Sequence, residues 1–156
     1  MKNELNYEFK LLSSDDIVTM RELLNLFGDV FNEVDTYCNH QPDTAYLRRL
    51  LDKAHFMAIV ALNSNKVIGG LAAYELQKFE QARSEIYIYD LAVDEAERRQ
   101  GVATGLIQTL KKIAAERGAY VVFVQADQGD EPAIALYNKL GIQEEVLHFD
   151  IAIKTG

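Results

Sequence analysis

Alternation of apolar and polar residues predicts strands and helices in the first half of the chain. Residues 7–12 (YEFKLL) alternate like a strand. Residues 56–62 and 67–76, joined by the polar segment NSNK, are typical of an antiparallel hairpin. Two helices are predicted between the first strand and this hairpin. The first follows the candidate N-caps Ser13, Ser14 and Asp15 and buries Ile17, Met20, Leu23, Leu24 and Phe27; the second begins near Asp43 and buries Tyr46, Leu47, Leu50 and Leu51.

The middle of the chain predicts a strand, a helix and a second strand. Residues 84–93 (SEIYIYDLAV) carry the strongest strand pattern. Residues 102–113 place apolar side chains on one helical face, and residues 119–126 (AYVVFVQA) predict a buried strand. Two strands joined by a helix are typical of a parallel pair with a helical crossover.

The last 25 residues or so predict one more helix and one more strand. The helix begins near Pro132 and ends at Gly141, where glycine can adopt a left-handed conformation. Residues 144–153 (EEVLHFDIAI) alternate like a final strand. The whole pattern predicts an α/β fold with a mixed sheet flanked by helices. With 156 residues, of which 49% are hydrophobic, the chain fits a single domain, residues 1–156.

Composition narrows the possible partners. The formal net charge is −8, and the basic residues form no run longer than Arg48-Arg49 and Arg98-Arg99, so no nucleic-acid partner is expected. Cationic small molecules fit this acidity better, although solubility alone could account for it. The N-terminal residues lack the apolar run of a signal peptide, and no stretch of about 18 uncharged apolar residues occurs. A soluble, cytoplasmic protein with no membrane partner is therefore expected.

The cysteine and the histidines give no sign of a metal site. The single cysteine, Cys38, excludes an internal disulfide and a cysteine-rich metal centre. His40, His55 and His148 show no metal-ligand spacing. No metal is expected.

One segment, ERRQGVATGLIQTL (97–110), has the features of an anion-binding helix start. Backbone N–H groups at a helix N-terminus lack intrahelical partners and attract anions. The small residues Gly101 and Ala103 would allow a ligand to approach the main chain closely. Neither a GK[ST] ending nor a GxGxxG turn is present, which excludes the two common nucleotide loops. Taken alone, the segment is explained as well by an ordinary capped helix with exposed arginines.

Longer blocks make a resemblance specific. DLAVDEAERRQGVATGLI (90–107), followed by ALYNKLGI (135–142), resembles the acetyl-CoA signature [RQ]xxGx[GA] of the GNAT N-acetyltransferase superfamily. Residues 27–43, 78–93 and 118–151 closely resemble the type I aminoglycoside 3-N-acetyltransferases. The resemblance runs from about residue 23 to residue 151. Two positions depart from the general superfamily pattern: Ala103 replaces the commoner glycine, and Tyr87 stands where histone-type members keep a glutamate base.

The resemblance implies a GNAT fold whose sheet is splayed between the fourth and fifth strands. The pantetheine arm of acetyl-CoA would lie in that gap and pair with backbone groups of Leu91, Ala92 and Val93. The N–H of Leu91 would polarise the thioester carbonyl. The pyrophosphate would be held by the amides of Arg99, Gln100, Gly101, Val102, Ala103 and Thr104, and Arg98 is a further cofactor-binding candidate.

The implied reaction moves the acetyl group of acetyl-CoA to the 3-amino group of an aminoglycoside of the gentamicin type, which gives antibiotic resistance. The family also implies a homodimer. Two alternatives stay open at this point. One is a GNAT enzyme that acetylates polyamines or other small amines, and the other is an acetyl-CoA-binding regulator without turnover.

A protonated amine cannot attack a thioester, so the reaction needs a base. Asp90 is the first candidate because an acidic residue within an apolar strand is costly unless it faces a cleft or finds partners. A hydrogen-bonded bulge residue would explain Asp90 as well. Glu85 is the rival, acting through water. Tyr137 matches the superfamily's usual acid for the leaving thiolate, although a bare helical tyrosine is more often part of a core.

Acidic residues in the last third of the chain suit a polycationic substrate. Each is by itself more often a solvated charge than a ligand. Glu144 and Asp150 are the preferred substrate-binding candidates, followed by Glu145, Asp127 and the strand residue Glu85; Asp130 and Glu131 belong to the same acidic group.

Overall fold

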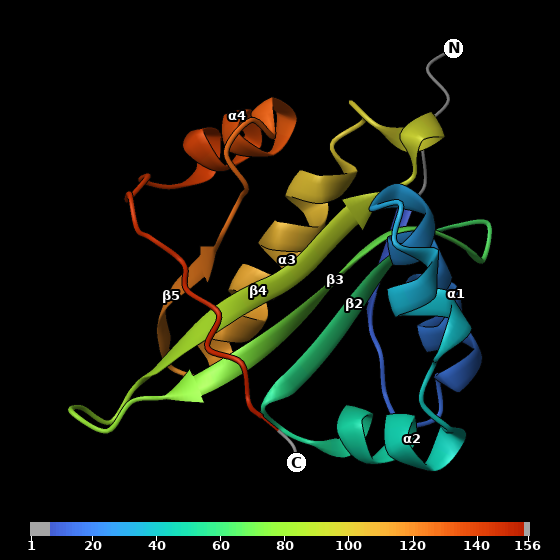
Figure 1. The fold of residues 1–156 in the computed structure, drawn as a ribbon, viewed down its shortest axis with the longest axis horizontal. Helices are drawn as coiled ribbons and strands as arrows, with labels where there is room; N and C mark the ends of the chain where they lie inside the picture. Colours follow the sequence, from blue (N-terminus) through green and yellow to red (C-terminus); the bar gives the residue numbers. More distant parts are fainter. Residues whose placement is uncertain (1–6, 155–156) are drawn as a thin grey trace. The chain divides into compact units, whose positions relative to one another are not determined.

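The computed structural model describes residues 7–154, and its centre is a five-stranded sheet in the order β1-β2-β3-β4-β5 (Figure 1). Strands β1 to β4 are antiparallel neighbours, whereas β4 and β5 are parallel. This confirms the expected mixed α/β sheet. The elements are β1 (Tyr7–Leu11), α1 (Ile17–Val30), a π-helix (Asp35–Asn39), α2 (Thr44–Asp52), β2 (Phe56–Asn63), β3 (Lys66–Gln77), β4 (Ser84–Val93), a 3₁₀ turn (Glu95–Glu97), α3 (Val102–Glu116), β5 (Ala119–Val124) and α4 (Glu131–Leu140).

Two adjacent glycines of β3 show how the helices cover the sheet. A Cβ atom on Gly70 would collide with Leu23 of α1, and a Cβ atom on Gly69 would lie 3.1 Å from Val102 of α3. Neighbouring residues of a strand point to opposite faces, so α1 and α3 pack on opposite sides of the sheet. Helix α2 packs on the same side of the sheet as α1, since Leu47 of α2 belongs to the same buried cluster as Leu23 of α1 (Figure 1).

Turn and cap residues explain several boundaries. Ser64 and Asn65 between β2 and β3 both have positive φ, 50° and 65°, as a tight two-residue hairpin turn requires. The carboxylate of Asp43 accepts a hydrogen bond from the N–H of Tyr46 at 2.9 Å and caps α2 as expected. The N-cap of α1 is Asp16, whereas the sequence predicted Ser13, Ser14 or Asp15. Its carboxylate binds the N–H of Ser13 at 2.8 Å and the ammonium of Lys10 at 2.9 Å.

The chain divides into two compact units, the first ending at Gln125 and the second beginning at Ala126. In the second unit, Pro132 lies in the first turn of α4, as predicted, and Asp130 caps this helix by accepting a hydrogen bond from the N–H of Ala133. Gly141 ends this helix in an extended conformation (φ −153°), so the left-handed ending predicted for it is wrong. No helix among the described residues is long and apolar enough to cross a membrane.

Two strand predictions need correction. Residues 144–153 are not a strand, because a strand needs a neighbour to pair with and the described part of the second unit contains none. Residues 119–126 give only β5, which ends at Val124 and is an edge strand. Its Tyr120 and Val121 are 49% and 38% exposed, so the prediction of a buried strand was wrong.

Candidate functional site

A β-bulge in β4 determines where the acidic side chain of Asp90 points. Asp90 pairs with Ala72 of β3, but the next β3 residue, Ala73, pairs with Ile88, so Tyr89 is an extra residue without a β3 partner. Side chains of a strand alternate between faces, and one extra residue reverses the alternation that follows it. Without the bulge Asp90 would share the face of Ile88, which is buried.

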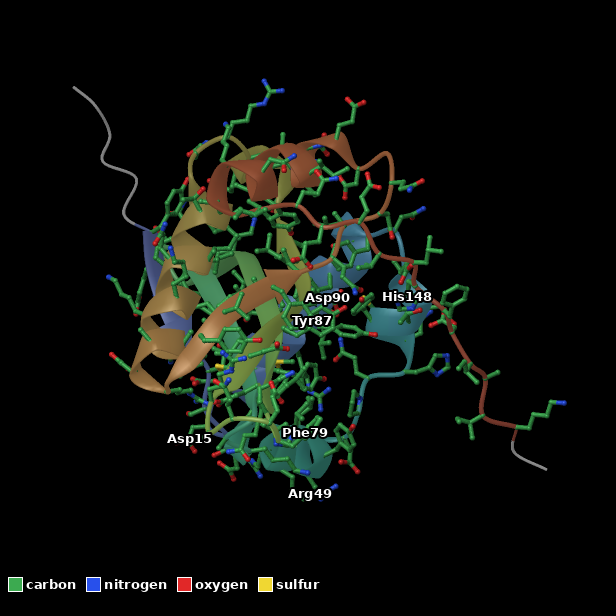
Figure 2. All side chains as sticks on the ribbon, turned by 90° about the vertical axis from the view of Figure 1, so that its left-hand side faces the viewer. Asp15, Arg49, Phe79, Tyr87, Asp90 and His148 are labelled. Carbon is green, nitrogen blue, oxygen red and sulfur yellow. The ribbon has the colours of Figure 1, made fainter. Side chains whose placement is uncertain are left out.

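The bulge places Asp90 on the face covered by α1. Its partner Ala72 belongs to the buried cluster that contains Met20, Leu23 and Phe27 of α1. Figure 2 shows Tyr87 beside Asp90 along β4. The two interpretations of Asp90 made from the sequence, a bulge residue and a site residue, are therefore compatible: the bulge moves the carboxylate from the face of Ile88 to the face covered by α1.

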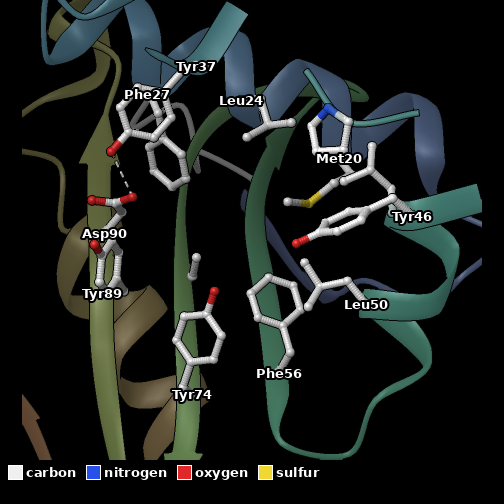
Figure 3. Close-up of a pocket in the computed structure, with 13 residues that line it drawn as sticks. Met20, Leu24, Phe27, Tyr37, Tyr46, Leu50, Phe56, Tyr74, Tyr89 and Asp90 are labelled. Atoms are coloured by element: carbon white, nitrogen blue, oxygen red, sulfur yellow. Dashed lines mark hydrogen bonds between the residues drawn. The ribbon is translucent and has the colours of Figure 1, made fainter. Parts of the chain in front are cut away.

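Tyr37 is the hydrogen-bond partner of Asp90. Its hydroxyl donates to Oδ2 of Asp90 at 2.9 Å (Figure 3). The ring of Tyr37 is held by Phe27 and Phe31, whose centroids lie 5.8 and 5.7 Å from it. A Cβ atom on Gly28 would lie 3.4 Å from the Cβ of Tyr37 and collide with Cys38, so glycine at this position lets the π-helix approach α1. Tyr37 was not among the residues predicted from the sequence, although π-helical turns of this kind are often found at functional sites.

The surroundings of Asp90 act on its proton affinity in two directions. Burial raises the pKa of the Asp90 carboxyl above its ordinary value, and the negative charge of Glu33 adds to that rise. The hydrogen bond from Tyr37 lowers the same pKa, because it stabilises the ionised form. Burial, followed by the bond to Asp90, raises the pKa of Tyr37, which therefore remains a donor. A carboxylate with raised proton affinity can take a proton from a cation bound beside it.

A pocket of about 180 Å³ opens next to Asp90 (Figure 3). Apolar side chains of α1 and α2, such as Leu24 and Leu50, form one side of it, and Phe56 of β2 forms another part. Tyr74 and Tyr89 of the neighbouring strands complete the wall next to the carboxylate. The pocket therefore combines a mostly apolar lining with one acidic group.

Glu85, the rival base, is at the other end of β4 in a different environment. Its carboxylate lies 3.5 Å from Nζ of Lys78 and accepts a hydrogen bond from the hydroxyl of Tyr120. The bond from Tyr120 and the charge of Lys78 lower the pKa of Glu85. A carboxylate held ionised by such partners is a weaker base than one with raised proton affinity.

The end of β4 has the free edge expected for a ligand-binding strand. The β4–β5 pairing ends at Ile88 and Val124. In the part of the chain that the structure describes, residues 89–93 of β4 therefore have no pairing partner in β5. On its other edge Leu91 pairs with Leu71, Ala92 with Gly70 and Val93 with Gly69. Backbone groups on the free edge can bind an extended ligand as a further strand would.

The loop after β4 presents free amides at the start of α3. Gly101 is the N-cap with φ 79°, and a Cβ atom added to it would meet no atom within 4 Å. The first internal bond runs from the N–H of Gly105 to the carbonyl of Gly101 at 2.9 Å, so the N–H groups of Val102, Ala103 and Thr104 precede the helical ladder. They and the open space over Gly101 fit a bound phosphate.

The remaining loop residues have structural contacts of their own. Arg98 donates from Nε to the carbonyl of Val93 at 3.3 Å and so ties the loop to the end of β4. Arg99 has a positive φ of 65°. Oε1 of Gln100 lies 2.5 Å from the hydroxyl of Tyr7 on β1.

The other candidate residues belong to the second unit, which is described by itself. Tyr137 lies in α4, and burial followed by the charge of Asp130 raises its pKa. Oδ1 of Asp150 lies 2.9 Å from Nε2 of His148. The side chains of Asp127, Glu144 and Glu145 are exposed. Asp90, the free strand edge and the loop thus belong to β4 and the segment directly after it, whereas Tyr137 and these acidic residues remain separate candidates.

Comparisons with known proteins agree with this geometry. Residues 20–142 match the model of the Acetyltransferase (GNAT) family. The aminoglycoside acetyltransferase HMB0005 from an uncultured soil metagenomic sample is 56% identical, with a TM-score of 0.94, over 96% of this chain and 99% of that one. A second such enzyme, meta-AAC0020, also from an uncultured soil metagenomic sample and solved in complex with sisomicin, is 34% identical, with a TM-score of 0.87, over 95% of this chain and 97% of that one.

Curated sequences give more distant matches. Probable N-acetyltransferase family 8 member 5 of Mus musculus is 27% identical over 128 residues, which are 82% of this chain and 56% of that protein. The chain thus spans about half the length of the curated relatives it matches.

Proposed function

The chain belongs to the GNAT family of acetyltransferases, and on that premise we propose that it transfers the acetyl group of acetyl-CoA to the 3-amino group of a gentamicin-type aminoglycoside. The observation that carries the proposal is Asp90, a partly buried carboxylate bonded to Tyr37 beside an open pocket. The two similar aminoglycoside acetyltransferases, one of them with sisomicin bound, support the substrate class. Acetylation removes a positive charge from the drug and would confer resistance.

The family uses acetyl-CoA, and the described residues fit it. The free edge of β4 offers Leu91, Ala92 and Val93 to the pantetheine arm, and the loop offers amides from Arg99 to Thr104 to the pyrophosphate. The N–H of Arg98 is bonded to the carbonyl of Glu95 and its Nε to the carbonyl of Val93, so Arg98 would contribute through the remaining N–H groups of its guanidinium. When bound, acetyl-CoA supplies the acetyl group as a reactive thioester.

The proposed chemistry assigns one proton transfer to each of two residues. Oδ2 of Asp90 is occupied by Tyr37, which leaves Oδ1 to hold the incoming ammonium and accept its proton, directly or through one water. The free amine then attacks the carbonyl carbon and a bond from nitrogen to carbon forms. As the bond from carbon to sulfur breaks, the nitrogen releases its second proton to solvent. The N–H of Leu91 stabilises the oxygen of the tetrahedral intermediate. Tyr137 protonates the leaving thiolate.

Acidic side chains complete the proposed drug site. We assign the remaining ammonium groups of the drug to Glu144 and Asp150, with Glu145, Asp127 and Glu85 as further contacts. The proposal includes a single catalytic domain over residues 1–156, a homodimer, a reaction without a metal and a cytoplasmic location, where acetyl-CoA is available.

The decisive experiment measures acetyl-CoA turnover with gentamicin, kanamycin and spermidine, and assigns the acetylated nitrogen by NMR. We expect turnover with gentamicin and a product acetylated at the 3-amino group. A preference for spermidine would favour the polyamine alternative, and acetyl-CoA binding without turnover of any amine would favour the regulator. A Michaelis constant for gentamicin that does not rise with ionic strength would contradict the assignment of the acidic residues.

A further inference from the structure

The pocket beside Asp90 is mainly apolar, although the proposed drug is polar and carries several charges. Of the side chains that line it, Asp90 carries the single carboxylate, and among the described residues no lysine, arginine or histidine contributes to the lining. The side away from Asp90 is formed by Met20, Tyr46 and Leu50, with Leu24 and Phe56 between. A second ammonium group entering the apolar part would lose its hydration without a charged partner, which is costly. The occupant that fits best carries one positive charge and one apolar group.

The volume and position of the pocket define the apolar group. An engineered cavity of about 150 Å³ lined by leucine, isoleucine and phenylalanine binds benzene. A volume of about 180 Å³ therefore suits one six-membered ring with a short linker. Figure 3 shows Asp90 and Tyr89 at one side of this space and Leu50 and Tyr46 at the other. A ring near Leu50 would leave its amino group directed to the carboxylate.

The tyrosines suit an occupant with both features. Tyr74 and Tyr89 form an edge-to-face pair with centroids 6.1 Å apart, next to Asp90. Their rings offer apolar contact to a ring, and their faces attract an ammonium group. Tyr46 is 51% exposed, so the side formed by α2 is open to an entering molecule.

From these observations we infer that the enzyme also acetylates monoamines that carry a single apolar ring on a short linker, the chemical class of 2-phenylethylamine. The inference rests on the proposed function, since it uses the same base. The ammonium group gives one proton to Asp90, and the free amine attacks the thioester carbon. The carbon–sulfur bond breaks, the nitrogen releases a second proton to solvent, and the thiolate takes up one proton. The products are the N-acetyl amine and coenzyme A.

Four small probes separate charge from apolar contact. They are 2-phenylethylamine, ethylamine without the ring, 2-phenylethanol without the charge, and glucosamine with a hydroxylated ring. Turnover of the three amines is measured with acetyl-CoA, and binding of all four by calorimetry. We expect 2-phenylethylamine to be acetylated with a Michaelis constant at least about tenfold below that of ethylamine, since burying a ring removes several CH₂-sized groups from water. The dissociation constant of 2-phenylethanol should exceed that of 2-phenylethylamine by a similar factor, because the alcohol lacks the positive charge that binds Asp90.

A pair of matched variants locates the ring. Leu50 and Leu26 are both partly buried and pack against the same core cluster, but only Leu50 lines the pocket. Leu50→Ala should raise the Michaelis constant for 2-phenylethylamine about tenfold and that for ethylamine much less. Leu26→Ala should change neither constant. Equal effects of the two variants would overturn the assignment of the pocket.

The outcomes distinguish this inference from the proposed function. Acetylation of gentamicin without acetylation of 2-phenylethylamine would overturn the inference and keep the proposed function. Glucosamine as good a substrate as 2-phenylethylamine would also overturn it, because the pocket would then favour a polar ring. If no amine were acetylated, the proposed function would fail and the acetylation inferred here would fail with it. Calorimetry would then show whether the pocket still selects the ring amine.

Discussion

Asp90 of β4 lies opposite Ala72 of β3, one residue out of step with the pairing of Ala73 and Ile88. This offset moves the carboxylate from the face of the sheet that carries Ile88 to the face covered by α1, where Tyr37 donates a hydrogen bond to it. The proposed chemistry depends on this local irregularity, and the first three predictions test what it does.

Asp90→Asn keeps the size of the side chain and removes its ability to accept the proton. Turnover of the preferred amine should fall by about 10²- to 10⁴-fold, the usual contribution of a positioned base. Raising the pH should restore part of the rate, because more of the amine is then unprotonated. Steady-state kinetics at neutral and alkaline pH checks this. Glu85→Gln should have a much smaller effect, and a large loss in that variant alone would transfer the role to Glu85.

Tyr37→Phe tests the hydrogen bond to Asp90. The bond lowers the pKa of Asp90, so its loss should raise that pKa and move the acidic limb of the kcat/KM profile to higher pH. Above that limb the rate should approach that of the native enzyme. Tyr87→Phe is a suitable control, because the Tyr87 hydroxyl bonds Gln125 at 3.0 Å instead. If Tyr37→Phe left the limb in place, Tyr37 would have only a packing role.

Asp90→Asn should also change stability with pH. The pKa of Asp90 is higher in the folded than in the unfolded chain, so the folded state binds more protons between these two pKa values. The contribution of Asp90 to stability is therefore full below the unfolded pKa, about 4, and is lost as pH rises through the folded pKa. Relative to the native chain, the Asn variant should gain free energy of unfolding between acidic and neutral pH. Urea titrations at both pH values measure this gain, and a relative loss would contradict the sign.

Gly101→Val tests the loop. An added Cβ atom meets no protein atom within 4 Å, so the valine side chain should enter the space assigned to the pyrophosphate and weaken acetyl-CoA binding strongly. Gly118→Val is a matched control: Gly118 has φ 77°, close to the 79° of Gly101, and equally open surroundings, but it lies between α3 and β5. Both variants should lose similar stability. Calorimetric titration with acetyl-CoA separates them, and equal affinity in the two would contradict the loop assignment.

Tyr137→Phe tests the proposed acid. The variant loses one hydroxyl group with little change in shape, so turnover should fall while acetyl-CoA affinity stays close to that of the native chain. Pre-steady-state measurements establish whether acetyl transfer limits the rate. Unchanged acetyl transfer in a regime limited by chemistry would return Tyr137 to a structural role.

Local patterns predicted most of the fold. Residues 84–93 were predicted as a strand and form β4 with the same bounds, because the apolar run is flanked by turn residues. The capping role of Asp43 also follows from local chemistry. The strand predicted at residues 144–153 is absent. Alternation of apolar and polar residues shows that a segment can adopt a strand conformation, but it does not provide a neighbouring strand to pair with.

The site was predicted only in part, since its key features depend on contacts distant in sequence. Asp90 stands out as an acid within an apolar strand. The bulge that orients Asp90 is defined by the pairing of β4 with β3, and the sequence of β4 alone does not predict the bulge. Tyr37 is 53 positions away from Asp90 and lies in a π-helix that no periodic pattern marks. Such pairs follow from packing between elements.

The extra residue in β4 also affects how this chain should be aligned with its relatives. Residues before Tyr89 and residues after it keep opposite phases of the inward and outward alternation. A relative without the bulge would match this chain on one side of Tyr89 and be shifted by one residue on the other. An alignment without a gap over β4 would then pair Asp90 with a residue whose side chain lies on the other face of the sheet. The equivalent acid of the relative would stand one column away. Searches for the acid in related sequences should therefore count backwards from the residue that matches Ala92.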